Sequence, residues 1–271
     1  MTTLVTGGAG LVGSRLLKHF VMAGVECRAL VRSARQLPDG VERVEGDLFD
    51  TAALGKAAQG VSAIVHLAAV FRTQDEKEIW RANLEGTRSL IAAVKQYAPH
   101  ARFIMASTCL VYNENASRPG LEQDELHPSQ AYPASKVAAE KELRDSGLNW
   151  SVLRLPFVYG DGDEHLASVP AVVSKMKWHP ARTFSLAHQR DVARAFEWAL
   201  TGATDGRIVN IADDAPSTLY DMARAVGVMV ESSAEPLQNP WWGRADATLS
   251  RSLGFGPTVA TLGQAVREGI L

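Results

Sequence analysis

Membrane-spanning segments, targeting signals and cysteine pairs are the first features that this sequence lacks. No apolar run reaches the ~18 residues that suggest a membrane-crossing helix. The chain enters a strand almost at once, without a charged leader and an apolar signal core. We therefore expect no membrane partner and a cytoplasmic protein. The cysteines, Cys27 and Cys109, have neither metal-ligand spacing nor a C-x-x-C pairing, so we expect free, reduced thiols.

An excess of charge of either sign is also missing. The chain holds 28 Lys and Arg against 30 Asp and Glu, a net charge of −2, and no basic block stands out, which argues against a nucleic-acid partner. His165, His179 and His188 are scattered along the chain. The acidic turn at 161–164 has no accompanying ligand cluster, so we expect solvated carboxylates there and no metal.

What the sequence does contain is a regular alternation of strands and helices. Its 271 residues, 46% hydrophobic, suffice for one substantial core. Apolar runs predict strands near the start and at 26–31, 41–45, 61–67, 102–106 and 151–155; helical periodicity predicts helices from residue 13, at 77–97 and at 132–144. This alternation predicts an α/β fold, a doubly wound parallel sheet of the Rossmann type with a small C-terminal substrate lobe.

The alternation loosens after Pro156, which suggests where the domains divide. A helix at 190–200 and a strand at 208–211 are expected to rejoin the sheet. We predict a dinucleotide-binding domain formed by 1–156 and about 186–211. Segments 157–185 and 212–271 then form the substrate-binding lobe. In that lobe, Trp241 and Trp242 could line a substrate lid or pack in its core.

A glycine-rich turn joins the first expected strand to the first expected helix. Glycine tolerates positive φ and has no Cβ, so Gly7 and Gly8 can turn sharply while Gly10 lets the backbone approach a pyrophosphate. Gly13 begins the helical run, whose free N–H groups and dipole would face that phosphate. A tight strand-to-helix turn with no ligand is the alternative, so other features must decide.

Two later strand ends suggest the adenosine part of a dinucleotide. Arg32 follows the second expected strand, where an acidic residue would suit free ribose hydroxyls, whereas a guanidinium suits a 2′-phosphate. Arg35 could assist; a solvated surface arginine is the alternative. Asp47, after the third strand, could accept the adenine amino group or cap a helix. We favour the adenine role because Thr51 is the better start for the next helix.

A tyrosine and a lysine lie one helical turn apart in the helix expected at 132–144. Tyr132 is a poor acid or base at neutral pH unless a nearby positive charge, such as that of Lys136, stabilises its phenolate. Ser107 and Thr108 end the fifth strand and could orient a reacting oxygen. For Tyr132 and Lys136 alone, an amphipathic surface helix is the alternative. His66 is expected to be a buried, hydrogen-bonded histidine.

Together these features resemble the extended short-chain dehydrogenase/reductase family, in its NAD(P)-dependent epimerase/dehydratase group. The matching segments are 6–13 (TGGAGLVG), 46–48 (GDL), 66–69 (HLAA), Asn83 with 86–87 (GT), 107–108 (ST), Tyr132 with Lys136, and 153–156 (LRLP) before 158–160 (VYG). They extend over nearly the whole chain. Chance does not account for so many motifs in this order.

The resemblance assigns roles to these residues. It implies catalysis by Thr108, Tyr132 and Lys136, with Asn83 acting in structure or a proton relay. It implies that the cofactor contacts Gly7, Gly10, Leu11, Val12, Gly13, Arg32, Asp47, Leu48, Ala68, Ala69, Ser107, Tyr132, Lys136 and Pro156. Lys136 would also hold the nicotinamide ribose, and Pro156 would border the nicotinamide. A homodimer through helices 77–97 and 132–144 is implied, with a monomer as the alternative.

The sequence also departs from parts of the family pattern. Cys109 and Leu110 stand where sugar-nucleotide dehydratases have an Asp-Glu pair, which disfavours dehydration. The arginines that usually hold a substrate diphosphate cannot be assigned to Arg182 or Arg190. The segment around Arg32 is similar to the dihydroflavonol-reductase-like branch, whose members often reduce carbonyls with NADPH.

These inferences predict an NAD(P)-dependent oxidoreductase. It would transfer a hydride to or from a hydroxyl or carbonyl carbon of a small organic or sugar-like substrate, with NADP as the cofactor and NAD as the alternative. A nucleotide-sugar epimerase with tightly bound NAD is the enzymatic alternative. A non-catalytic NADP-binding redox sensor is the alternative from another class.

Overall fold

A parallel sheet of seven strands forms the centre of the structure, a computed structural model that describes residues 1–32 and 36–271. The strands run in the order β10-β6-β5-β4-β1-β2-β3. Their bounds are β1 Thr3–Thr6, β2 Cys27–Val31, β3 Glu42–Glu45, β4 Ala63–His66, β5 Arg102–Thr108, β6 Asn149–Leu155 and β10 Arg207–Asn210. The order reverses between β1 and β4, where open α/β sheets bind ligands beyond the carboxyl ends of their strands. The predicted Rossmann-type fold is confirmed.

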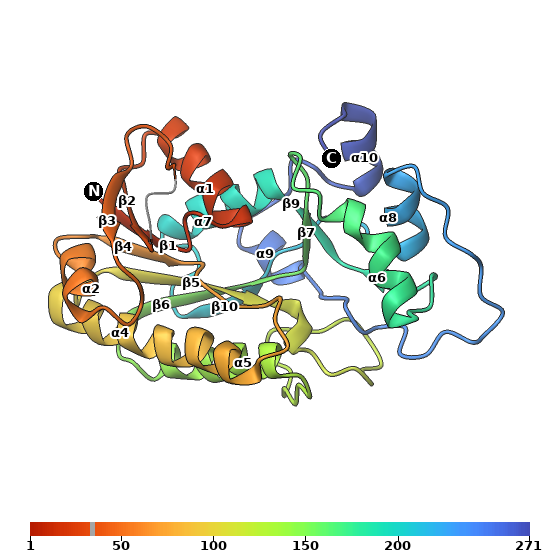
Figure 1. Ribbon diagram of the computed structural model, residues 1–271, viewed down its shortest axis with the longest axis horizontal. Coiled ribbons are helices and arrows are strands. Elements are labelled where there is room, and N and C mark those ends of the chain that lie inside the picture. The colour runs from red at the N-terminus through yellow and green to blue at the C-terminus, as the bar shows by residue number, and fades with distance from the viewer. Residues whose placement is uncertain (33–35) are drawn as a thin grey trace.

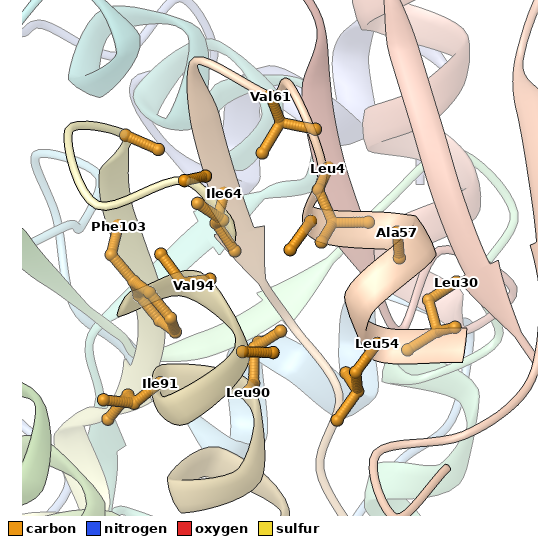
Figure 2. Close-up of a cluster of buried hydrophobic side chains, with 14 of the residues drawn as sticks. Leu4, Leu30, Leu54, Ala57, Val61, Ile64, Leu90, Ile91, Val94 and Phe103 are labelled. Atoms are coloured by element: carbon orange, nitrogen blue, oxygen red, sulfur yellow. The ribbon is translucent and has the colours of Figure 1, made fainter. Parts of the chain in front are cut away.

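Helices cover both faces of this sheet (Figure 1). One face carries α2 (Thr51–Ala58), α4 (Gly86–Tyr97) and α5 (Ala131–Arg144); the other carries α1 (Leu11–Met22) and α7 (Gln189–Leu200). Leu54 of α2 and Leu90 of α4 point toward the sheet residues Ile64 and Phe103 (Figure 2). Burying these apolar faces on both sides explains why the inner strands β1, β4 and β5 are almost wholly buried.

The helix predicted at 77–97 is interrupted by one wider turn. It consists of α3 (Glu76–Trp80), a π-helical turn η1 (Arg81–Glu85) and α4. The π turn contains Asn83, which is fully buried. The amide of Asn83 donates to the Val70 carbonyl (3.0 Å) and accepts from the Val70 N–H (2.8 Å). The π turn therefore fixes the loop that follows β4.

The remaining elements pack beside one end of the sheet (Figure 1). They are η2 Cys109–Val111, β7 Phe157–Tyr159, η3 Leu166–Ser168, α6 Val169–Met176, β8 Thr183–Phe184, β9 Leu186–His188, β11 Ser217–Thr218, α8 Leu219–Ala225, α9 Thr248–Ser252 and α10 Leu262–Glu268. Strand β7 pairs with β9, and β8 with β11. A separate apolar cluster with Tyr159, Phe184 and Trp242 forms the core of this lobe, so Trp242 packs inside it. The division into two domains stays a prediction.

Neither a membrane-spanning helix nor a metal-binding cluster occurs in the described part of the chain. Within residues 1–32 and 36–271, no helix combines the length and apolarity needed to cross a membrane. The same residues contain no group of three or more histidine, cysteine or acidic side chains arranged to hold a metal ion. Cys27 and Cys109 are buried free thiols, as predicted.

Candidate active site

The glycine turn between β1 and α1 is closed by contacts that only glycine allows. Gly7 has φ of +74°, and a Cβ there would lie 2.6 Å from the backbone nitrogen of Ala68. A Cβ on Gly13 would lie 2.1 Å from the Gly7 carbonyl oxygen. Gly10 is the N-cap of α1, and no side chain caps this helix. The first turn of α1 therefore offers backbone N–H groups at the carboxyl edge of the sheet.

Arg32 lies at the carboxyl end of β2, exposed, and lines a hollow of ≈330 Å³ with Glu45, Gly46, Asp47 and Asp50. Arg35 lies outside the described residues. The hollow therefore lies between the ends of β2 and β3, the two strand ends where we predicted that adenosine binds.

The helix after β3 is capped differently from the prediction. Asp50 is the N-cap of α2 and accepts from the Ala53 N–H (2.9 Å), so the cap that the sequence led us to expect at Thr51 lies one residue earlier. Asp47 accepts through its Oδ1 from the N–H groups of Phe49 (2.7 Å) and Asp50 (3.1 Å). One oxygen of Asp47 is thus used to fix its own loop. Its contact with adenine stays a prediction.

The three predicted catalytic side chains meet beyond the end of β5. Thr108 is the last residue of β5, and Tyr132 and Lys136 lie in the first half of α5. The Thr108 hydroxyl lies near enough to Tyr132 to favour the ionised form of its phenol. The ring of Phe71, from the loop after β4, packs against that of Tyr132, with centroids 4.4 Å apart. Nothing in the sequence had singled out Phe71.

Burial sets the ionisation of this pair. It raises the pKa of Tyr132 to about 12, and the nearby Thr108 hydroxyl only partly opposes this shift. Burial also lowers the pKa of Lys136 to about 8, against the opposing negative charge of Glu140. At neutral pH Tyr132 is therefore a neutral phenol and Lys136 is mostly an ammonium ion. A neutral phenol can donate a proton, which is the form that carbonyl reduction requires.

Two buried polar side chains support the site from behind. Asn83 donates to Ser135 Oγ (3.0 Å), and Ser135 donates to the carbonyl of Tyr132 (2.7 Å), so the π turn is tied to the start of α5. The two ring nitrogens of His66 bond to hydroxyls of β1 and α4. Burial lowers the pKa of His66 to about 3, so it is neutral, and its interpretation as a buried, hydrogen-bonded histidine is confirmed.

The other predicted cofactor contacts lie along the same edge of the sheet. Ala68 and Ala69 follow β4, Leu48 follows β3, and Pro156 follows β6. Ser107 is different, because its hydroxyl is buried and donates to the carboxylate of Glu140. Contact of these residues with a cofactor stays a prediction.

Two further residues, Arg190 and Asp191, form ion pairs or hydrogen bonds within the protein. The guanidinium of Arg190 pairs with Asp161 (2.9 Å). Asp191 lies in the first turn of α7, as expected, and its carboxylate accepts from the N–H groups of Thr258 (2.7 Å) and Val259 (2.8 Å). It therefore anchors the segment before α10 to α7.

Comparison with known proteins places this geometry in a family. Residues 3–212 match the model of the NAD dependent epimerase/dehydratase family. A ketoreductase of Stigmatella aurantiaca that acts on 4-hydroxy-2-methyl-3-oxo-4-farnesyl-3,4-dihydroquinoline-1-oxide is 29% identical over 93% of this chain and 80% of its own. A ceramide reductase of Caulobacter vibrioides is 31% identical over 59% of this chain, and the match spans 47% of that protein.

Solved structures show the same fold. The UDP-glucose 4-epimerase of Thermus thermophilus, in complex with NAD, superposes with a TM-score of 0.80 at 24% identity over 98% of this chain and 97% of its own. The family model extends from β1 to just beyond β10, so it includes the glycine turn, Thr108, Tyr132 and Lys136. The chain therefore belongs to the NAD dependent epimerase/dehydratase family, as an enzyme of the NAD(P)-dependent oxidoreductase and epimerase class.

Proposed function

We propose that this enzyme reduces the ketone carbonyl of a largely apolar molecule to an alcohol, with NADPH as the reductant. The observation that carries the proposal is the placement of Tyr132 near the Thr108 hydroxyl at the end of β5, with Lys136 one turn further along α5. The two relatives named above support the direction and the substrate class, because both are reductases of lipid-like molecules.

Tyr132, Thr108 and Lys136 have different roles in the proposed carbonyl reduction. NADPH, when bound, supplies the hydride. Tyr132, neutral at physiological pH, donates its proton to the carbonyl oxygen as negative charge develops there. Thr108 holds that oxygen by a hydrogen bond, and the Lys136 ammonium stabilises the phenolate that Tyr132 becomes.

A cofactor would be held along the carboxyl edge of the sheet. The first turn of α1 would bind the pyrophosphate, because the close packing of Gly7 and Gly13 leaves no side chain between the backbone and that phosphate. Arg32 would bind the 2′-phosphate. The carboxylates beside Arg32 oppose a phosphate, but Asp47 and Asp50 each direct an oxygen to backbone N–H groups of their own loop.

The lobe offers a place for the apolar part of the substrate. A groove of ≈590 Å³ there is lined by Val173, Trp178, Pro180, Val230 and Pro236 together with polar and charged residues that include Lys177, Arg182 and Glu235. We test the substrate class with matched ketones that differ only in alkyl chain length, followed by the loss of NADPH absorbance. A rise of kcat/KM with chain length supports the proposal. Absence of ketone reduction across that panel contradicts it.

Arg32→Asp is expected to reverse the cofactor preference. The substitution removes a charge-assisted contact to the 2′-phosphate and supplies a carboxylate for free ribose hydroxyls. Loss of a charged hydrogen bond of ~1.5–3 kcal/mol corresponds to about a 10- to 100-fold higher Kd for NADPH. The Kd for NADH should change little or fall. Fluorescence titrations of both cofactors measure these values.

The control for this titration is Arg207→Asp, which makes the same charge change at an exposed residue that begins β10, at the amino edge of the sheet. It should leave both affinities unchanged. A wild-type preference for NADH, or an NADPH preference that survives Arg32→Asp, contradicts the role of Arg32.

The same preparation separates the two alternative functions. An epimerase would be purified with tightly held NAD and would convert a nucleotide sugar without net cofactor turnover. A redox sensor would bind NADPH but reduce none of the ketones. Light scattering of the same protein gives its molecular mass, which tests the proposed homodimer through α4 and α5.

A further inference from the structure

A buried carboxylate lies on the same helix as the proposed catalytic lysine. Glu140 follows Lys136 by one helical turn on α5, and each side chain is only 2% exposed. Its Oε1 accepts from the hydroxyl of Ser107, the neighbour of Thr108 on β5. The same carboxylate receives two bonds from Arg154 of β6, Nε to Oε1 (3.1 Å) and Nη2 to Oε2 (2.7 Å). Glu140 thus joins three elements of the site.

This contact is built into the sheet rather than added at its surface. Ser107 and Arg154 are register partners on β5 and β6, so their side chains leave the same face, toward α5. Arg154 is 1% exposed, and its Nη1 also donates to the hydroxyl of Tyr112 (3.1 Å). That hydroxyl in turn donates to Asn210 of β10 (2.6 Å). Such a satisfied network holds its members in one arrangement.

We propose that Glu140 is a positioning residue for the reduction: it fixes the end of β5 against α5 and places its carboxylate one helical turn from Lys136. The inference rests on the proposed roles of Tyr132 and Lys136. It assigns Glu140 a function beyond the structural ion pair with Arg154. A purely structural Glu140 would influence folding alone.

The electrostatics around Lys136 give this proposal a measurable consequence. The titratable or charged side chains around it are Tyr132 and Glu140 on its own helix, His66 on β4, and Arg154 on β6, which reaches it through Glu140. Burial lowers the pKa of Lys136 to about 8, and Glu140 opposes that shift. Tyr132 and His66 are neutral near pH 7, so Glu140 supplies the negative charge of this group.

Glu140→Gln is the first test, because glutamine keeps the shape and can still accept from Ser107. Without the negative charge the pKa of Lys136 should fall further, so the high-pH limb of kcat should move down by about one unit, the low end of the range for a neighbouring charge. Reduction would then be about tenfold slower than wild type above pH 9 and nearly unchanged at pH 6. A loss by the same factor at every pH would overturn the proposal.

A second variant separates charge from folding. Glu140→Gln leaves the Arg154 guanidinium buried without its carboxylate, so the melting temperature should drop. The double variant Glu140→Gln with Arg154→Met removes that stranded charge and should recover much of the melting temperature. The double variant also lacks the positive charge of Arg154, whose loss raises the pKa of Lys136, so its high-pH limb should lie between those of Glu140→Gln and wild type. A high-pH limb of Glu140→Gln that already matches wild type, at a lowered melting temperature, means that Glu140 is structural only.

An NMR titration makes the test independent of turnover. The ¹³Cε signal of Lys136, in lysine-labelled protein and assigned with Lys136→Met, reports the lysine pKa in wild type and in both Glu140 variants. A lower midpoint in both variants supports the inference even if the protein reduces no ketone, in which case only the proposed function fails. An unchanged midpoint overturns the inference.

Discussion

Replacement of Tyr132 with phenylalanine is expected to abolish ketone reduction while sparing cofactor binding. The substitution removes one oxygen, so the packing against Phe71 is kept and the proton donor is lost. Loss of a general acid lowers kcat by ~10²–10⁴-fold, and Tyr132 is the proposed general acid of the reduction. We expect kcat to fall by at least ~10³-fold, with the Kd for NADPH within about twofold of wild type. Steady-state assays and fluorescence titration measure the two quantities.

Tyr97→Phe is the matched control. Tyr97 ends α4, just before β5 begins, so it lies at the amino edge of the sheet, away from Thr108. Removing its hydroxyl should leave kcat and cofactor affinity unchanged. Near-normal turnover in Tyr132→Phe, with the control also active, would refute the proposed mechanism. Equal loss of turnover and of NADPH binding would instead assign Tyr132 to cofactor binding.

The sheet could be predicted from the sequence because its inner strands are buried on both faces. Continuous apolar runs between amphipathic helices leave few alternatives to a parallel sheet covered on both sides. The ends of the strands were less certain. Strand β6 begins at Asn149, two residues before its predicted start, because the backbone of Asn149 pairs with Arg102 although its side chain is polar and exposed. Where a strand begins depends on its pairing with the neighbouring strand, and the local hydrophobic pattern carries no information about that pairing.

The π turn at 81–85 shows a second limit. Periodicity predicts a helix across this segment but does not distinguish a turn with one extra residue. That extra residue turns Asn83 toward Val70 and Ser135, which are 13 and 52 residues away in sequence. The hydrogen bonds that make the wider turn favourable therefore become visible only in the folded chain.

The part of the candidate site that could be predicted is the part marked by short-range sequence patterns. The spacing of Tyr132 and Lys136 and the glycines of the first turn are short-range patterns. Glu140 carries the same spacing from Lys136, yet a glutamate on a helix usually faces water. Only Arg154, on a strand that follows α5, shows that this carboxylate is buried and paired. In the same way, geometry alone decides that Asp50 rather than Asp47 or Thr51 caps α2.

Gly13→Ala is expected to damage both the fold and the cofactor site. A Cβ there would lie 2.1 Å from the Gly7 carbonyl oxygen and 2.7 Å from the Gly8 Cα, and neither backbone atom can rotate away. The start of α1 must therefore move away from β1. Overpacking of this kind costs ~1–3 kcal/mol, and displaced N–H groups should raise the Kd for NADPH about tenfold or more. Thermal unfolding and cofactor titration follow the two effects.

Alanine substitutions at two other glycines, Gly256 and Gly10, are compared with Gly13→Ala. Gly256→Ala is the control, since no atom lies within 4 Å of a Cβ there, and it should change neither quantity. Gly10→Ala places its Cβ 3.2 Å from the Gly7 oxygen, at the exposed N-cap residue of α1. It should therefore weaken NADPH binding with little loss of melting temperature, because its methyl group meets the phosphate rather than the protein. Unchanged NADPH affinity in both Gly10→Ala and Gly13→Ala would show that this turn binds no pyrophosphate.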